Sequence, residues 1–261
     1  MLSKLLKHEF KATARLLLPL YLVLAVLTVF DRIVLSLHFT GTLSMITGFV
    51  TTAYIVSLIA IVVVSFVIII TRFYKNLMSD EGYLMFTLPV KPHQLINSKL
   101  IVSMVWTLAS IAGVILSLLG VFATSDRLKL LEEAFVIQIN NVKYTFGDKG
   151  FTLIMTELCI LILFGLLHNI LMIYLSIALG QLFRGHKLLG SFASYIAINT
   201  VLQILVTLAM VLAGFLFSKS FVEIDSLPQI IFPITIAYTV IFSALFYFFT
   251  NLIFRKKLNL E

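Results

Sequence analysis

Apolar residues fill six long stretches of the chain, and short polar segments separate them. The stretches lie near residues 16–37, 48–70, 100–122, 151–179, 190–217 and 230–253. Each one has the roughly 20 residues that an α-helix needs to cross about 30 Å of hydrocarbon. Strands of a membrane β-barrel are only about ten residues long and alternate apolar with polar positions. Because lipid cannot satisfy free backbone groups, the pattern predicts an all-α protein with six transmembrane helices.

Composition supports a membrane protein. Hydrophobic residues make up 61% of the chain and charged residues 12%, whereas soluble domains have roughly 45–50% apolar and about 25% charged residues. A water-soluble fold of 261 residues could not bury that much apolar surface. We therefore expect residues 1–261 to form a single transmembrane domain. The first apolar stretch is longer than the core of a signal peptide and lacks a small-residue cleavage site, so it should remain as the first span.

The distribution of Lys and Arg predicts the orientation, since basic residues near span ends are retained in the cytoplasm. Six spans put both termini on one side. With the termini inside, the cytoplasmic segments hold 13 of the 19 basic residues and only Glu9, Asp80, Glu81 and Glu261 of the acids. The sequence thus predicts a multi-pass plasma-membrane protein with two cytoplasmic ends. The basic balance follows from this orientation, and the sequence does not indicate nucleic-acid binding.

The first 15 residues form an amphipathic pattern. Leu2, Leu5, Leu6, Phe10 and Leu17 recur on one helical face, and the basic residues Lys4, Lys7, Lys11 and Arg15 lie on the other. We expect this segment to lie along the inner leaflet, with its basic face toward anionic headgroups, before the chain turns into the bilayer at Leu16. The alternative is a basic flank that serves only orientation.

Two resemblances to enzyme motifs fail on spacing. His8-Glu9 begins like a zinc-protease helix, but Ala12 stands where that motif needs a second histidine. The glycine-rich stretch from Gly180 to Lys187 lacks the Gly-Lys-Ser/Thr sequence of a P-loop. No metal site, catalytic residue or bound cofactor is therefore expected in this chain.

Polar residues inside the spans are few, and each is costly in lipid unless it faces protein or water. His168 lies near the middle of the fourth span, while Asn199 and Gln203 lie four residues apart on one face of the fifth. These three residues could line a substrate path or a contact between two protomers, or they could form ordinary interhelical hydrogen bonds. Asp31 and Arg32, at the outer end of the first span, are expected to extend toward the headgroups.

The largest extracellular segment covers residues 123–150. Its pattern predicts a short amphipathic helix over residues 127–135 and a β-hairpin over residues 136–146 that turns at Asn140-Asn141.

The cytoplasmic segment at residues 72–99, between the second and third spans, is the most informative one. Ser79, followed by two acids, suits a helix start, Pro89 suits a helix end, and Pro92 suits the first turn of the next helix. Between Ser79 and Pro89 lies an apolar run from Tyr83 to Leu88, on the water side of the membrane. Such a run must be covered by the leaflet, the helix bundle or another protein.

This segment resembles the cytoplasmic loop of ABC-2 type transporter permeases of Gram-positive bacteria. The resemblance rests on the stretch Asp80–Val90, followed by Gln94-Leu95 and Ser98-Lys99, and on the six spans, the basic N-terminus and the length. One departure is the short link at residues 218–229, which leaves little room for the re-entrant hairpin of many members.

The resemblance implies an exporter subunit. Residues 1–15 would be an elbow helix, and the loop would hold a coupling helix on which a separate ABC ATPase subunit docks and hydrolyses ATP with Mg²⁺. The residues implied in this docking are Asp80, Glu81, Gly82, Tyr83, Leu84, Phe86, Leu88 and Pro89. A second permease copy or paralogue would complete a dimer, and exporters of amphipathic or antimicrobial peptides, including lantibiotic-immunity and phenol-soluble-modulin exporters, are the implied subgroup.

Two alternatives belong to other classes. An ion-coupled secondary transporter would need carboxylates or broken helices near the membrane midplane, and no span carries a central Asp or Glu. An intramembrane enzyme would need a nucleophile or metal constellation, which one Cys and one mid-span His do not provide.

Overall fold

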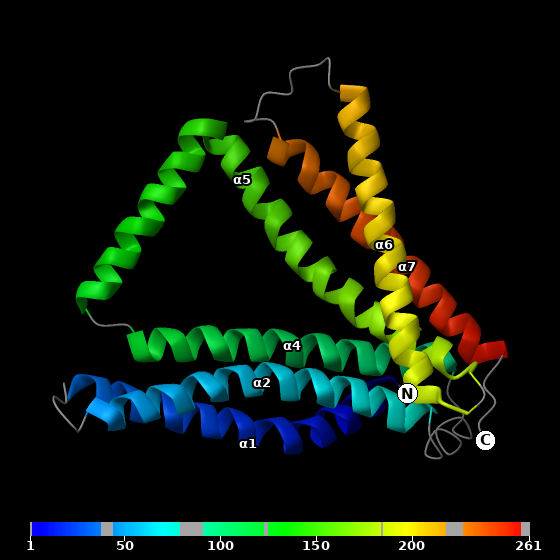
Figure 1. Cartoon of the computed structure of the whole chain (residues 1–261), viewed down its shortest axis with the longest axis horizontal. Coiled ribbons are helices and arrows are strands. Elements are labelled where there is room, and N and C mark those ends of the chain that lie inside the picture. Colours follow the sequence, from blue (N-terminus) through cyan, green and yellow to red (C-terminus); the bar gives the residue numbers. More distant parts are fainter. Residues whose placement is uncertain are drawn as a thin grey trace. The chain divides into compact units, whose positions relative to one another are not determined.

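The computed structural model describes residues 2–37, 44–78, 91–122, 125–183, 185–217 and 227–256. Over these residues the chain is helical and contains no strand (Figure 1). The helices are α1 (Leu2–Ser36), α2 (Ser44–Met78), α4 (Pro92–Phe122), α5 (Ser125–Gly180), α6 (Lys187–Phe217) and α7 (Leu227–Lys256). All six are long and apolar enough to cross a membrane. The predicted all-α class with six candidate spans is confirmed, and the chain is a multi-pass membrane protein.

All six helices extend beyond the roughly 20 residues that the hydrocarbon requires, α2 and α4 among them. α2 has 35 residues and α4 has 31, and at 1.5 Å per residue they measure about 52 and 46 Å. α2 ends at Met78 and α4 begins at Pro92, where proline suits the first turn because it has no N–H to leave unpaired. The helix start predicted at Pro92 is therefore confirmed.

The predicted turn at Leu16 is absent. α1 continues through this position as one helix of 35 residues, with Pro19 inside it. The reason is packing, because Glu9, Thr13 and Leu17 belong to the same buried face as Leu24 and Asp31. A separate elbow helix over residues 1–15 is thus not an element of this structure, although the basic residues of that segment do lie on its exposed face.

The hairpin predicted over residues 136–146 is also wrong. α5 begins at Ser125 and is helical up to a break at Gly147, which has φ 72° and ψ 170°. Phe135, Ile139 and Phe146 follow a helical period that outweighs the β-branched content of the segment. Asn140 and Asn141 therefore lie inside a helix, and the glycine, which tolerates positive φ, makes the turn into the fourth span.

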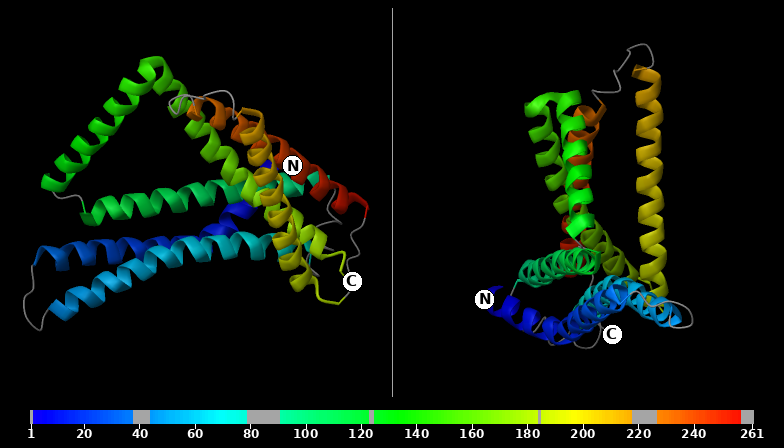
Figure 2. Two further views of the ribbon diagram at one scale, coloured as in Figure 1. Left: turned by 45° about the horizontal axis from the view of Figure 1, so that its top comes forward. Right: turned by 90° about the vertical axis from the view of Figure 1, so that its left-hand side faces the viewer.

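The helices pack into two compact units, each described by itself. The first contains residues 1–72 and 97–137, and the second contains residues 73–96 and 138–261. In the first unit α1, α2 and α4 lie side by side (Figures 1 and 2). Its apolar core contains Leu24, Tyr54, Ile61 and Val121.

Hydroxyl groups join the three helices of the first unit inside the apolar core. Tyr21 hydrogen-bonds Ser110 at 2.7 Å, and Thr28 hydrogen-bonds Ser117 at 2.6 Å. Both pairs span 89 residues in sequence, so α1 and α4 run in the same direction with a constant register. Tyr54 of α2 also bonds Ser117, at 2.9 Å.

Asp31 differs from expectation. Its side chain does not extend to the outside but is fully buried in the first unit, where Thr51 donates a hydrogen bond of 2.9 Å to Oδ1. The cause is α2, which covers this face of α1 and supplies the hydroxyl. Arg32 faces outward and donates to the carbonyl of Gly120 at 2.9 Å.

The second unit is built from the end of α2, the start of α4, most of α5, and all of α6 and α7. Phe73 stacks on Tyr174 with ring centroids 3.7 Å apart, and the edge of Phe254 completes a buried aromatic cluster. A Cβ at Gly180 would overlap the backbone of Ser191, so α5 and α6 meet closely there.

Candidate functional site

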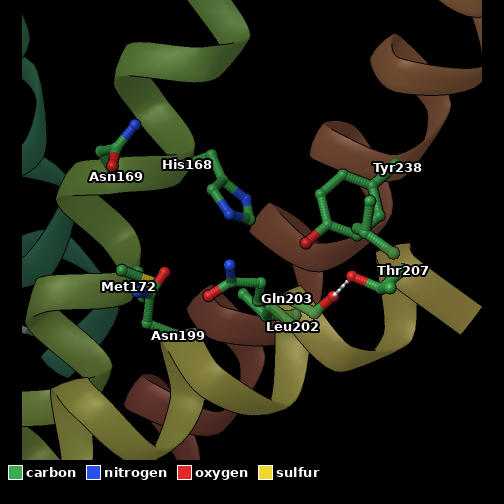
Figure 3. A pocket seen from close by; sticks show the side chains of 9 residues that line it. His168, Asn169, Met172, Asn199, Leu202, Gln203, Thr207 and Tyr238 are labelled. Atoms are coloured by element: carbon green, nitrogen blue, oxygen red, sulfur yellow. Dashed lines mark hydrogen bonds between the residues drawn. The ribbon is translucent and has the colours of Figure 1, made fainter.

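A polar cavity lies between α5, α6 and α7 in the second unit. Its volume is about 270 Å³. The residues that line it are His168, Asn169, Met172, Asn199, Leu202, Gln203, Val206, Thr207 and Tyr238. The three intramembrane residues singled out from the sequence, His168, Asn199 and Gln203, therefore meet at one site (Figure 3).

α5 contributes the imidazole of His168. The residue is 9% exposed, and its ring lies against two aromatic rings of α7, with centroid distances of 5.9 Å to Tyr238 and 5.1 Å to Phe246. The ring is hydrogen-bonded to the backbone of Thr239. Nδ1 has no hydrogen-bond partner within the described part of the chain. It is therefore a polar atom that a ligand or a water molecule in the cavity could satisfy.

α6 contributes three polar side chains at intervals of four residues. Asn199, Gln203 and Thr207 share one face of the helix, all three are exposed, and the Thr207 hydroxyl donates to the backbone carbonyl of Gln203 at 2.8 Å. The amides of Asn199 and Gln203 line the cavity (Figure 3). They belong to a mostly apolar span, where contact between an amide and lipid would be costly.

The lining combines polar groups with the apolar side chains of Met172, Leu202 and Val206. Among the lining residues that the structure describes, amides, hydroxyls and one imidazole provide both donors and acceptors, and none is an Asp, Glu, Lys or Arg. Such groups suit uncharged polar partners such as peptide bonds. No group of three His, Cys, Asp or Glu residues able to hold a metal ion occurs in the residues that the structure describes.

Tyr238 was not predicted from the sequence. It is one of several aromatic residues in an apolar span, and only the packing of α7 on α5 places it beside His168 (Figure 3). Asn169 follows His168 directly, but its amide donates to the carbonyl of Gly165 at 2.8 Å. The sequence signal that found the site was the rarity of amides and imidazoles within spans.

The other predicted site residues have different outcomes. Lys4, Lys7, Lys11 and Arg15 are exposed along α1, as a membrane-facing role would require. All eight residues of the predicted ATPase-docking segment, Asp80, Glu81, Gly82, Tyr83, Leu84, Phe86, Leu88 and Pro89, lie outside the described residues.

Comparison with known proteins adds no relative. The chain matches no family model, no curated protein and no solved structure.

A second polar cluster lies in the first unit and was not predicted. The Glu9 carboxylate accepts a 2.7 Å hydrogen bond from Lys99 of α4 and forms a 3.3 Å ion pair with Arg72 of α2. The side chains of Glu9 and Lys99 are 5% and 4% exposed. We call this cluster the Glu9 triad. Nothing in the spacing of these three residues indicates that they meet, because 63 and 90 positions separate the cations from Glu9.

Proposed function

We propose that this chain is the permease subunit of an ABC-2 type exporter and that a separate ATPase subunit drives it. The proposal is carried by the cytoplasmic stretch Asp80–Val90, whose residues resemble the coupling loop of that family. Its position supports the proposal, since it connects α2 and α4, which both contact α1 in the first unit. A docked subunit could move both helices through such a connection.

The substrate of the proposed exporter is an amphipathic or antimicrobial peptide. The cavity between α5, α6 and α7 supports this class, because its neutral donors and acceptors can bind peptide bonds while its apolar residues contact side chains. A second permease copy or paralogue would complete the path, and the exposed amide face of α6 is the surface that it would contact. The proposed location is the plasma membrane, with both termini in the cytoplasm.

The docking test uses two aspartate substitutions in the apolar run. Tyr83→Asp with Phe86→Asp should abolish co-purification of the proposed ATPase subunit, because charges in the centre of an interface remove its main anchors. Lys143→Asp, at the predicted extracellular side, is the matched control and should leave the complex intact. An ATPase retained at wild-type stoichiometry by the double variant would refute the docking assignment.

An ion-coupled secondary transporter is the second candidate, and Asp31 favours it. Its carboxyl is fully buried in a membrane helix, and Oδ2 has no hydrogen-bond partner within the described residues. Buried carboxyls of this kind often take part in ion transport. Inside-out vesicles distinguish the candidates. Peptide accumulation that requires ATP and the ATPase supports the exporter, whereas accumulation driven by an ion gradient without ATP supports the alternative.

A further inference from the structure

The Glu9 triad joins three helices through one carboxylate. Oε1 of Glu9 contacts Lys99 Nζ of α4 and Oε2 contacts Arg72 Nη2 of α2, at 2.7 and 3.3 Å. Each oxygen therefore holds a different helix. Glu9 itself belongs to α1, so a single side chain sets the relative position of all three elements at this level of the first unit.

The burial of the triad makes this arrangement specific. A buried charge is stable only with its partner in place, because neither water nor lipid can replace the lost solvation. Glu9 and Lys99 are almost inaccessible, and the Arg72 side chain is 20% exposed. A displacement of either cation therefore requires Glu9 to follow or the pair to separate at a high cost.

A second contact one turn along α1 reinforces the connection to α4. The indole N–H of Trp106 donates to the Thr13 hydroxyl at 2.7 Å, and the Phe10 ring lies 6.5 Å from the Trp106 ring. Thr13 also donates to the Glu9 carbonyl at 2.8 Å. The backbone around Glu9 is thus held in place, and the carboxylate position depends on the path of α1.

Both cations lie close in sequence to the proposed docking segment. Arg72 is six residues before the end of α2 at Met78, and Lys99 is seven residues after the start of α4 at Pro92. At 1.5 Å per residue these separations are about 9 and 10 Å of continuous helix. Arg72 and Lys99 therefore lie on the two helices that residues 79–90 connect, within two turns of where each helix ends or begins.

We propose that Glu9 is a positioning residue that couples the two helix ends flanking residues 79–90 to α1. Because α1 is one helix from Leu2 to Ser36, a movement at Glu9 continues along it to Asp31 and the outer part of the first unit. The inference rests on the proposed function, since it assumes that an ATPase moves the docking segment.

The first measurement tests the connection itself and needs no ATPase. In a Cys159→Ala background, spin labels on cysteines at Lys7 and Ile101, both exposed and both in the first unit, report the distance between α1 and α4 in nanodiscs. Glu9→Gln should broaden the distance distribution, because a neutral amide cannot balance the buried Lys99 and the half-buried Arg72. The exchange variant E9K/K99E keeps one anion and two cations in the cluster and should restore the narrow distribution. A distribution unchanged in Glu9→Gln would overturn the proposal.

The second measurement separates positioning from simple stabilisation. In nanodiscs that hold the complex with its ATPase, Glu9→Gln should retain the ATPase at wild-type stoichiometry but lower its turnover at least about fivefold, the lower end of usual coupling between distant sites. The exchange variant should recover turnover. Normal turnover in Glu9→Gln, together with a broadened distribution, would show that the triad only stabilises the fold and would refute a positioning role.

The two measurements also distinguish failure of the inference from failure of the proposed function. If no ATPase co-purifies with the wild-type chain, the proposed function is wrong and the coupling role of Glu9 falls with it. The spin-label distances would still show whether Glu9 connects α1 to α4.

Discussion

The buried and exposed ion pairs of this protein offer a comparison within one chain. Lys99 pairs with Glu9 at 2.7 Å with both side chains nearly inaccessible, whereas Lys143 pairs with Asp148 at 3.3 Å with side-chain exposures of 41% and 86%. Replacing each lysine by methionine keeps a long apolar stem and removes only the charge. The two variants, Lys99→Met and Lys143→Met, therefore differ chiefly in the burial of the partner left behind.

The expected magnitudes follow from that burial. Removing one partner of a buried pair costs about 3–5 kcal/mol, because the remaining charge cannot be solvated. Lys99→Met keeps Arg72, which lies 3.3 Å from Glu9 in the unsubstituted protein, so we expect the lower end, about 3 kcal/mol, or roughly a hundredfold in the unfolding equilibrium. An exposed pair contributes about 0–1 kcal/mol, since water screens it and replaces it.

The assay is the free energy of unfolding in mixed micelles, followed by tryptophan fluorescence. The single Trp106 contacts Phe10 and Tyr21 in the first unit, so its emission reports that unit directly. A third variant, E9L/R72M/K99M, removes the whole triad and leaves no unpaired charge. It should be more stable than Lys99→Met, because apolar residues of similar volume commonly replace a buried ion cluster without loss.

Two results would refute the reasoning. If Lys99→Met and Lys143→Met lowered the free energy of unfolding by the same amount, water or lipid headgroups would have to reach the Glu9 triad. A triple variant less stable than Lys99→Met would mean that the charges stabilise the fold by more than the cost of burying them.

The remaining predictions concern topology and the cavity. Cysteines at Lys4 and His186, in an otherwise cysteine-free chain, should be protected from an impermeant thiol reagent in right-side-out vesicles, while one at Lys143 should react; the reverse pattern would invert the orientation. Replacing Asn199 and Gln203 by leucine should impair peptide export without reducing membrane insertion, since both amides line the cavity. If a well-expressed double variant exported peptide normally, Asn199 and Gln203 would contribute only to helix packing.

The sequence by itself determined the class and the number of spans. In lipid, apolar stretches of this length satisfy their backbone hydrogen bonds only as helices. The all-α class and the six spans therefore did not depend on which helix packs on which. The intramembrane residues His168, Asn199 and Gln203 could also be selected, because a polar group in a span is rare enough to be informative one residue at a time.

Only the tertiary structure decided which residues meet. The amphipathic pattern of residues 1–15 was correct, yet the packed face that includes Glu9 and Thr13 continues into the span, and α1 stays one helix. Asp31 and Glu9 could be solvated charges in any sequence-based reading, since both lie near span ends. Their burial depends on Thr51, Arg72 and Lys99, which distant segments of the chain bring to them. The spacing of residues along the sequence shows which side chains share a face of one helix. Which other helix covers that face depends on how the helices pack together.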